Sequence, residues 1–339
     1  MNENSIGISL VICCYNSVDK IPTTLKYLAV QIKSVDIKYE LILVDNNCSD
    51  DTTQVAIRTW SSYGNPFPFR IVKQPKAGLT YARQMGIQSS SFEYIILCDD
   101  DNWLCDDYLK KTFNLFEKFP DAALIGGVGE AVFETTPPKW FKKVNGFGYA
   151  VGNEEASTGL VAAVYGAGMG IRKSIFQKLI TNETLFILSD RKGHNLSSGG
   201  DTEICMIFRN NGYKIYLDSS LTFKHFLTSD RLNWKYYLKL RRSFGKANAY
   251  LQLYNNELVS GIRKKNRARE FSSLVKFILT NWKYIVFPAF YQNAYCAEMA
   301  QQLSMRYTRV FEFKKINTIA KQMTLVESKT QSVTVPRDI

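Results

Sequence analysis

The first 130 residues alternate between short, almost wholly apolar runs and longer segments in which apolar residues recur with helical spacing. The apolar runs cover residues 8–14, 39–44, 69–72, 94–98 and 123–127, and the helical segments cover 23–31, 51–63, 78–90 and 106–119. Repeated strand-helix units predict an α/β fold with a doubly wound, mostly parallel, Rossmann-like sheet. Continuous apolar strands are typical of a sheet that helices cover on both faces.

This regular pattern weakens after residue 130. Glycine-rich segments at 166–170 and 197–200 predict loops and antiparallel strands over one edge of the sheet. From residue 232 the chain is helical in pattern, aromatic and basic, and its last residues are polar. We therefore expect one domain over residues 1–230, with halves at 1–130 and 131–230, then a helical basic region at 231–325 and a flexible tail at 326–339.

The charge of the chain is concentrated in that C-terminal region. The 339 residues carry a net charge of +12, and the part from Arg231 to Lys321 holds 18 Lys and Arg against four Glu, which is +14. A basic, aromatic-rich helical stretch indicates a surface that lies on anionic lipid, with a merely solvated helix face as the alternative. Because no recognised nucleic-acid motif accompanies the charge, we expect no nucleic-acid partner.

Cysteine usage and the N-terminus bear on the compartment. The seven cysteines form no CxxC pair, and the first residues lack the basic segment and cleavage site of a signal peptide. We expect a cytoplasmic protein without structural zinc. No apolar run is long enough to span a bilayer, so a peripheral position at the inner face of the cell membrane is the alternative to a free one.

Polar residues follow three of the predicted strands at the point where each ends. Tyr15 and Asn16 follow the first strand, Asp45 and Asn46 follow the second, and a run of three aspartates, 99–101, follows the fourth. In open α/β sheets the ligand site lies beyond the carboxyl ends of the strands. We expect these residues to share one site.

The three aspartates need a positive partner, because each charged carboxylate raises the cost of ionising its neighbours. No Lys or Arg lies within several residues, so a divalent cation is the simplest partner, and oxygen ligands favour Mg²⁺ or Mn²⁺. Alternation along an extended chain lets Asp99 and Asp101 converge while Asp100 faces elsewhere. The alternative is that the cluster only leads into and caps the helix beginning near Asp106.

Six motifs, in this order, resemble the family 2 glycosyltransferases of GT-A fold, and the resemblance covers roughly residues 6–245. They are CCYNS (13–17), ILVDNNCSDDT (42–52), KAGLTYARQMGI (76–87), ILCDDDN (96–102), GAGMGIRKS (166–174) and GGDTEI (199–204). The resemblance implies transfer of a sugar from a nucleotide diphosphate sugar, usually UDP-linked, with inversion at the anomeric carbon and with Mg²⁺ or Mn²⁺. It implies a glycan or lipid-linked acceptor in cell-surface polysaccharide biosynthesis.

The same resemblance assigns the catalytic base. Asp201 matches the aspartate of the family's Glu-Asp motif, whereas Gly200 stands where the family has the glutamate. Glu203 is then a secondary candidate for the catalytic acid-base role. The alternative for Asp201 is a helix N-cap, and both roles can coexist.

Donor, metal and acceptor residues follow from the resemblance in the same way. Tyr15 is expected to stack on the base, and Asn46 stands where many members carry Asp. Arg83 is expected to meet base or phosphate, with a solvated helix face as its alternative. The full donor set is Tyr15, Asn16, Asp45, Asn46, Lys76, Gly78, Arg83, Asp99 and Asp100.

The metal ligands implied are Asp101, Asp99 and His225, although a lone histidine can also be only a hydrogen-bonded neighbour. Trp140, Gly168 and Met169 resemble the acceptor-side wall. Trp140 fits a place in the core equally well.

Two other classes compete with this interpretation. Sugar-nucleotide pyrophosphorylases share the sheet and the acidic metal site, but residues 8–20 lack their glycine-rich, basic phosphate loop. A non-catalytic nucleotide- or glycan-binding relative is the other class. The presence of Asp99, Asp101 and Asp201 argues against it.

Overall fold

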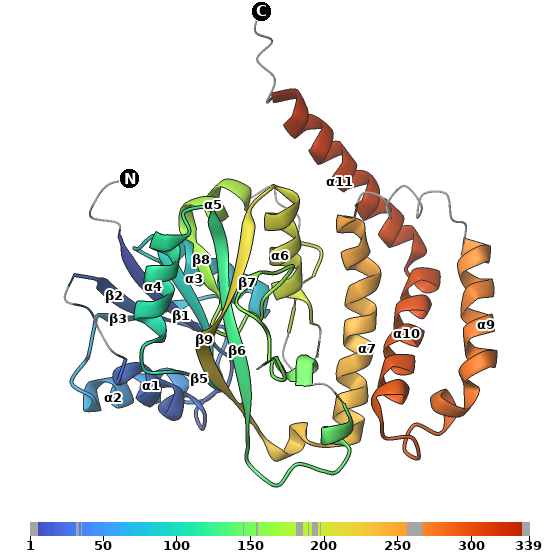
Figure 1. Ribbon diagram of the computed structural model, residues 1–339, viewed down its shortest axis with the longest axis horizontal. Coiled ribbons are helices and arrows are strands. Elements are labelled where there is room, and N and C mark those ends of the chain that lie inside the picture. Colours follow the sequence, from blue (N-terminus) through green and yellow to red (C-terminus); the bar gives the residue numbers. More distant parts are fainter. Residues whose placement is uncertain are drawn as a thin grey trace, which may run out of the picture. The chain divides into compact units, whose positions relative to one another are not determined.

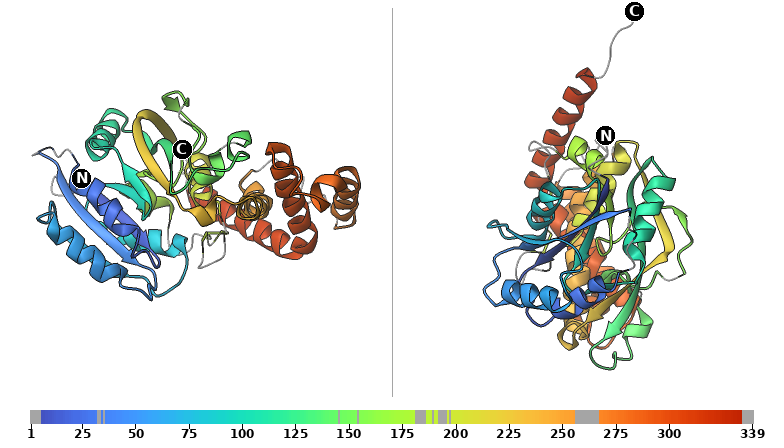
Figure 2. Two further views of the ribbon diagram at one scale, coloured as in Figure 1. Left: turned by 90° about the horizontal axis from the view of Figure 1, so that it is seen from below. Right: turned by 90° about the vertical axis from the view of Figure 1, so that its left-hand side faces the viewer.

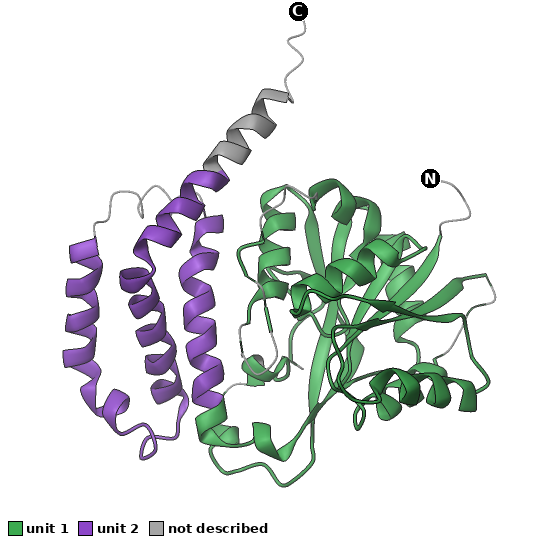
Figure 3. Cartoon of the chain, turned by 180° about the vertical axis from the view of Figure 1, so that it is seen from behind, with its two compact units in different colours: residues 1–236 green, residues 237–339 purple. Residues whose placement is uncertain are grey.

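The computed structural model describes residues 6–31, 34, 36–144, 146–153, 155–180, 186–188, 190–191, 196, 198–255 and 267–333, without the side chains of residue 147 and of those beyond 323. The chain divides into two compact units, Met1–Tyr236 and Tyr237–Ile339 (Figure 3). The sequence places the same division six residues earlier, at 230/231. Each unit is described by itself.

The first half of unit 1 is the predicted series of parallel strands and helices (Figure 1). Its strands are hydrogen-bonded in the order β3-β2-β1-β4, with parallel pairing throughout. The elements are β1 (Gly7–Cys14), α1 (Ile21–Ala29), β2 (Lys38–Asp45), α2 (Thr52–Ser62), β3 (Phe69–Lys73), α3 (Leu79–Ser89), β4 (Tyr94–Asp99) and α4 (Tyr108–Lys118).

Both faces of this parallel sheet are covered, which explains its continuous apolar strands. Leu10 of β1 belongs to a core cluster that includes Leu25 of α1 and Trp60 of α2. The neighbouring Val11 points to the other face, toward α3. A Cβ atom at Gly86 of α3 would lie 2.3 Å from Val11 Cγ1, so only glycine allows this helix to pack so closely.

The sheet has nine strands in all, and its second half mixes directions. Beyond β4 the order is β8-β6-β9-β5, with β7 also paired to β9. The pairs β4/β8, β6/β8, β5/β9 and β7/β9 are antiparallel, while β6 and β9 run parallel (Figure 2). The elements are β5 (Asn102–Leu104), β6 (Ala122–Phe133), β7 (Gly159–Leu160), β8 (Gly170–Arg172), α5 (Lys173–Leu179), α6 (Gly200–Asn210) and β9 (Lys214–Leu227), with short 3-10 turns at Phe141–Lys143, Gly146–Tyr149 and Ser229–Arg231.

Unit 2 is helical, as the sequence predicts. After the first residues of α7 (Trp234–Leu251) it contains the 3-10 turn Gln252–Tyr254, α9 (Arg267–Val286), α10 (Ala294–Phe311) and α11 (Phe313–Val333). Helix α10 packs on α9 and on α7, where a Cβ at Gly245 would lie 2.1 Å from the Gln301 carbonyl oxygen. Helix α11 continues to Val333, into the predicted tail, and residues 334–339 lie outside the described part. Among the described helices, none has both the length and the apolar character needed to cross a bilayer.

Candidate active site

The three consecutive aspartates lie at the carboxyl end of β4, and each side chain has a different partner. Asp99 ends β4 beside Cys13 of β1 and pairs with Arg83. Asp100 pairs with Lys20, and Asp101 pairs with Arg231. The positive charge that the cluster requires therefore comes from protein cations distant in sequence. The prediction that a divalent cation is the simplest partner of the three aspartates did not take these distant side chains into account.

Asp100 holds the start of α1, and its carboxylate has different partners from those of Asp99 and Asp101. Its carboxylate accepts hydrogen bonds from Ser17 Oγ and from Lys20 Nζ at 3.1 Å, and its carbonyl oxygen accepts one of 2.7 Å from Thr24 Oγ1. Burial and the charge of Asp101 raise the pKa of Asp100, although Lys20 opposes the effect. These contacts give Asp100 a structural role in place of the predicted donor contact.

Asp101 is buried between two basic side chains. Its Oδ2 lies 2.9 Å from Arg231 Nη1, and its Oδ1 lies 3.4 Å from His225 Nε2. Burial by itself would raise the pKa of Asp101, but His225 and Arg231 hold it well below its usual range. The carboxylate is therefore charged at neutral pH.

His225 is oriented by the backbone. It lies in β9 opposite Asn102 of β5, and its Nδ1 is hydrogen-bonded to the carbonyl oxygen of Tyr149. A carbonyl can only accept, so Nδ1 carries a proton; Nε2, which faces Asp101 and Arg231, donates to Asp101 when the ring is protonated and offers a lone pair when the ring is neutral. A second hydrogen bond of this kind is what orients metal-binding histidines.

The donor set at Asp101 and His225 fits a divalent cation with two protein ligands. The two electron-pair donors, Asp101 Oδ1 and His225 Nε2, are 3.4 Å apart. Asp99, the third predicted ligand, is instead paired with Arg83, and the described residues contain no cluster of three His, Cys, Asp or Glu side chains that could hold a metal. The Arg231 guanidinium lies beside both donors, 3.3 Å from His225 Nε2.

Arg83 is a buried bridge between acidic residues. Its Nη2 lies 3.4 Å from Asp99 Oδ1 and its Nη1 lies 3.4 Å from Asp190 Oδ2. Burial works against the charged form, but Asp99, Asp190 and then Asp201 raise the pKa of Arg83. The alternative of a solvated helix face is wrong for this residue.

Asp190 is an acid of this site that the sequence did not reveal. It is buried with φ +52°, and burial raises its pKa to about 6 although Arg83 opposes the shift. A Cβ atom at Gly200 would lie 2.8 Å from Asp190 Oδ2. The carboxylate of Asp190 therefore fills the space next to Gly200, the position at which the resemblance implies a glutamate.

Asp201 lies in the first turn of α6 with its carboxylate only partly buried. The N-cap of this helix is Gly199 at φ +105°, so the N-cap alternative for Asp201 is wrong. Its Oδ2 accepts a hydrogen bond of 3.2 Å from Gly166 N, and its Oδ1 accepts one of 2.7 Å from Thr202 N.

Glu203, the secondary candidate, is structural. It is fully buried, and its two oxygens accept hydrogen bonds from Ile187 N at 2.6 Å and Leu188 N at 3.1 Å. Two residues along a helix are separated by about 200° around its axis, so Glu203 and Asp201 point to opposite sides. The prediction of an acid-base role for Glu203 is wrong on this geometry.

Among the predicted donor-binding residues after β1 and β2, Tyr15 has an exposed ring, whereas Asn16 and Asp45 form hydrogen bonds that hold a loop. Tyr15 is 46% exposed, which leaves its ring available for stacking. Asn16 Oδ1 accepts from Ser49 N at 2.8 Å, and Asp45 Oδ1 accepts from Cys48 N at 2.8 Å. Both side chains hold the turn that follows β2.

Asn46 supports the loop before α3. Its Nδ2 donates to the carbonyl oxygens of Gln74 and Lys76, and its Oδ1 accepts from Gly78 N at 2.9 Å. Both N–H groups of the Asn46 amide are engaged in these hydrogen bonds. Asn46 therefore influences binding of a nucleotide sugar by holding this loop in position. Lys76 remains exposed, with its Nζ 3.7 Å from the centre of the Tyr81 ring, and Gly78 takes φ +138° at the start of α3.

The acceptor-side predictions fall mostly on core residues. Trp140 is buried, 5.2 Å from the ring of Trp234 in an edge-on contact, and Met169 is fully buried. Gly168 takes φ +72°, and a Cβ there would lie 2.3 Å from Tyr108 Oη. The burial of Trp140 favours its core alternative, and the side chains of Trp140 and Met169 are both buried away from any open acceptor surface.

Arg231 and Asp190 are the main residues that sequence reasoning missed. The antiparallel pairing of β9 with β5 brings His225 to Asp101. Arg231 lies six positions after His225, in the turn that follows β9, and reaches the same carboxylate. That spacing was the available signal. Asp190 lies in an irregular segment whose sequence has neither helical nor strand periodicity. Only the glycines at 199 and 200 indicated that another side chain packs closely against this part of the chain.

The fold and site define a protein of the sugar-transferase class. The family model of glycosyl transferase family 2 matches residues 9–180, just over half of the chain. The chain therefore belongs to glycosyl transferase family 2. The predicted GT-A type fold, with a central sheet and additional C-terminal helices, is confirmed.

The curated relatives are similar over part of their length. One is the poly-beta-1,6-N-acetyl-D-glucosamine synthase of Staphylococcus aureus (strain MSSA476), 28% identical over 36% of this chain and 27% of its own length. Another is the glucosyl-dolichyl phosphate glucuronosyltransferase of Haloferax volcanii, 21% identical over 50% of this chain and 55% of its own length. The chain thus matches from about a quarter to just over half of each of these relatives. Among solved structures, S. aureus TarS 1-349 in complex with UDP-GlcNAc is 15% identical with a TM-score of 0.49, over 89% of this chain and 91% of its own.

Proposed function

We propose that this glycosyltransferase moves a sugar from a nucleotide diphosphate sugar, with UDP as the nucleotide, to a glycan or lipid-linked acceptor, with inversion. The observation that carries the proposal is that the charges of Asp99 and Asp201 both act on Arg83, with Asp99 in direct contact with it. Asp99 ends β4, and Asp201 on α6 lies close enough for its charge to act on Arg83. Asp99 lies at the carboxyl end of its strand, where such sheets bind ligands, and Asp201 comes from a separate helix.

Asp201 is the proposed base. Its carboxylate takes the proton of the acceptor hydroxyl as the hydroxyl oxygen bonds to the anomeric carbon from the face opposite the leaving diphosphate. The bond from the anomeric carbon to the phosphate oxygen breaks in the same displacement, which inverts the configuration. The hydrogen bonds from Gly166 N and Thr202 N fix the direction of the Asp201 carboxylate.

Other residues receive the donor. The exposed ring of Tyr15 stacks on the base, and Lys76 and Arg231 supply positive charge for the diphosphate. Asp101 and His225 would hold Mn²⁺ or Mg²⁺, which neutralises charge on a leaving diphosphate when bound. Arg83 is a positioning residue that keeps Asp99 and Asp190 in place.

The surroundings of the reaction are part of the proposal. Two relatives named for a polysaccharide and for a dolichyl phosphate-linked sugar support a glycan or lipid-linked acceptor. The net charge of +14 between Arg231 and Lys321 supports a peripheral place at the inner face of the cell membrane.

Nucleotide release tests the proposal. The protein is incubated with UDP-, GDP- and dTDP-sugars, with and without Mn²⁺, and free nucleoside diphosphate is measured. Release of UDP that rises with a glycan or lipid-linked acceptor supports the proposal. In a parallel incubation with added pyrophosphate, formation of nucleoside triphosphate would instead identify a pyrophosphorylase, and tight UDP-sugar binding without release would identify a binding protein.

A further inference from the structure

Helix α9 in unit 2 exposes a continuous row of large apolar side chains. Its opposite side packs inward, where Leu274 is buried. Exposed fractions in the row reach 70% for Leu279 and 48% for Trp282. The row consists of Phe271, Val275, Ile278, Leu279, Trp282 and Val286, and it continues beyond the helix with Phe287 and Phe290.

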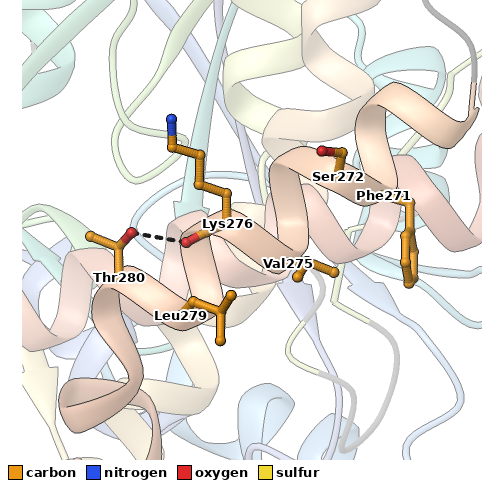
Figure 4. A pocket seen from close by; sticks show the side chains of 6 residues that line it. All are labelled: Phe271, Ser272, Val275, Lys276, Leu279 and Thr280. Carbon is orange, nitrogen blue, oxygen red and sulfur yellow. Dashed lines mark hydrogen bonds between the residues drawn. The ribbon is translucent and has the colours of Figure 1, made fainter.

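The row has a charged border. Phe271, Val275 and Leu279 recur at spacings of four residues and point to the same side of the helix, while Lys276 points away from them (Figure 4). Lys276 lies on the neighbouring strip of the helix with Arg269 and Lys283, and all three are exposed. The helix thus presents a wide apolar band with cations along one side.

We propose that this face of α9 is a membrane-binding surface for anionic lipid. Lying flat, the apolar row enters the boundary between head groups and acyl chains, and the three cations meet the lipid phosphates. A straight helix of 20 residues is about 30 Å long; α9 is kinked at Asn281 (φ −115°, ψ 16°), and exposed apolar residues of the row lie on both sides of the kink. The aromatic rings of Trp282 and Phe290 suit the interfacial layer.

This location is a narrower part of the basic region, Arg231 to Lys321, that the sequence suggested. The basic stretch around residues 232–254 became α7, whose apolar side is buried through Tyr237, Leu240 and Tyr250. Helix α7 therefore contributes charge but no free apolar face. Helix α9 carries both, and its role is independent of which sugar the protein transfers.

A second copy of the chain is a poorer occupant of the same face. The only acidic residue in α9 is Glu270, which is buried. Two copies stacked through this row would bring the cations of one helix toward those of the other without an exposed carboxylate of α9 to pair with them. An anionic bilayer supplies the missing charge.

Vesicle sedimentation with the full-length protein tests the proposal. Vesicles of phosphatidylcholine alone are compared with vesicles that also contain phosphatidylglycerol. We expect binding only to the anionic vesicles, a steep loss of binding with added salt, and a loss of at least about tenfold in Leu279→Glu and in Trp282→Glu. The matched control is Leu160→Glu, an exposed leucine in unit 1, which should bind like the unchanged protein.

A second pair of variants distinguishes a loss of membrane binding from a loss of folding. Lys276→Glu combined with Lys283→Glu changes only exposed charges and should abolish binding, whereas Lys110→Glu with Lys118→Glu on α4 should not. Equal binding to neutral vesicles, or unchanged binding in the α9 variants, would overturn the proposal. So would a dimer, detected by light scattering, that Leu279→Glu dissociates. Because no sugar transfer is measured, these outcomes are separate from those of the nucleotide-release assay.

Discussion

Arg231 donates a hydrogen bond of 2.9 Å to Oδ2 of Asp101, from a position that also lies 3.3 Å from His225 Nε2. The guanidinium thus supplies positive charge at the point where a carboxylate and an imidazole lone pair converge. A divalent cation at these two ligands would compete with this guanidinium. The competition between Arg231 and a metal ion can be measured without any enzymatic assay.

Replacing Arg231 by Met should lower stability and increase the effect of Mn²⁺. Removing one partner of a buried ion pair leaves an uncompensated charge, at a cost of about 3 to 5 kcal/mol. Mn²⁺ can then replace the lost positive charge, so the rise in melting temperature on adding Mn²⁺ should be larger in Arg231→Met than in the unchanged protein. Lys214→Met, which breaks the exposed pair with Asp121, is the control and should leave stability nearly unchanged. An equal response to Mn²⁺ in all three proteins would show that the ion binds elsewhere.

Asp101→Asn and Asp100→Asn should separate the metal ligand from the structural aspartate. Asp101→Asn should abolish the gain in UDP affinity that Mn²⁺ gives, because it removes a charged ligand. Asp100→Asn should keep that gain and lower the melting temperature, because Asp100 holds the start of α1 through Ser17 and Lys20. Titration calorimetry with Mn²⁺ and with EDTA measures both affinities. The metal assignment is wrong if the unchanged protein binds UDP equally in the two buffers.

Asp190→Asn should gain stability relative to the unchanged protein as pH rises from 4 to 7. Burial raises the pKa of Asp190 from an ordinary value of 3.8 to about 6, so between these values the folded state keeps a proton that the unfolded state has lost. Its contribution to the free energy of unfolding therefore falls as pH rises through this window. The amide stays neutral and avoids the loss, which amounts to the order of 2 kcal/mol.

Melting temperatures of Asp190→Asn across this pH range check the sign. The exposed Asp106→Asn is the control, and its difference from the unchanged protein should not vary in the same way. We also expect Asp190→Asn to lose turnover, because Arg83 loses one of its two charged partners. A constant stability difference over the whole pH range would contradict the assigned role of Asp190.

Glu203→Gln should destabilise the fold while leaving the chemistry of the bound state intact. The two backbone N–H groups of Ile187 and Leu188 share its carboxylate, and an amide can accept with only one oxygen. Leaving a buried donor unsatisfied costs about 1 to 3 kcal/mol. Chemical denaturation measures that loss, and single-turnover rates below the melting transition should stay within about twofold of the unchanged protein. A loss of rate like that of a missing base would restore Glu203 as a catalytic candidate.

The parallel half of the fold was predictable because its strands are buried on both faces. Continuous apolar runs such as 41–44 have no polar positions that could blur their limits, and the turns that follow them carry the site residues. The orientation of Glu203 was also available, since a separation of two residues on a helix opposes it to Asp201.

The partners of the aspartates were harder to find because they come from distant segments. Lys20, Arg83 and Arg231 reach the cluster only through the packing of α1, α3 and the turn after β9. Because no Lys or Arg lies near the aspartates in the sequence, a metal ion was the expected source of the positive charge beside them. The exposed row of α9 has a clear helical period, but the sequence alone does not say which side of a helix is buried.

Turnover of Asp201→Asn tests the central claim most directly. Asparagine keeps the size of the side chain and can still accept one of the two hydrogen bonds, from Gly166 N or from Thr202 N, but it is far too weak a base to take the acceptor proton. With a matched donor and acceptor, the account predicts a loss of about 10²- to 10⁴-fold in kcat, with UDP affinity and melting temperature nearly unchanged. A variant that folds, binds UDP and turns over at close to the normal rate would contradict the account.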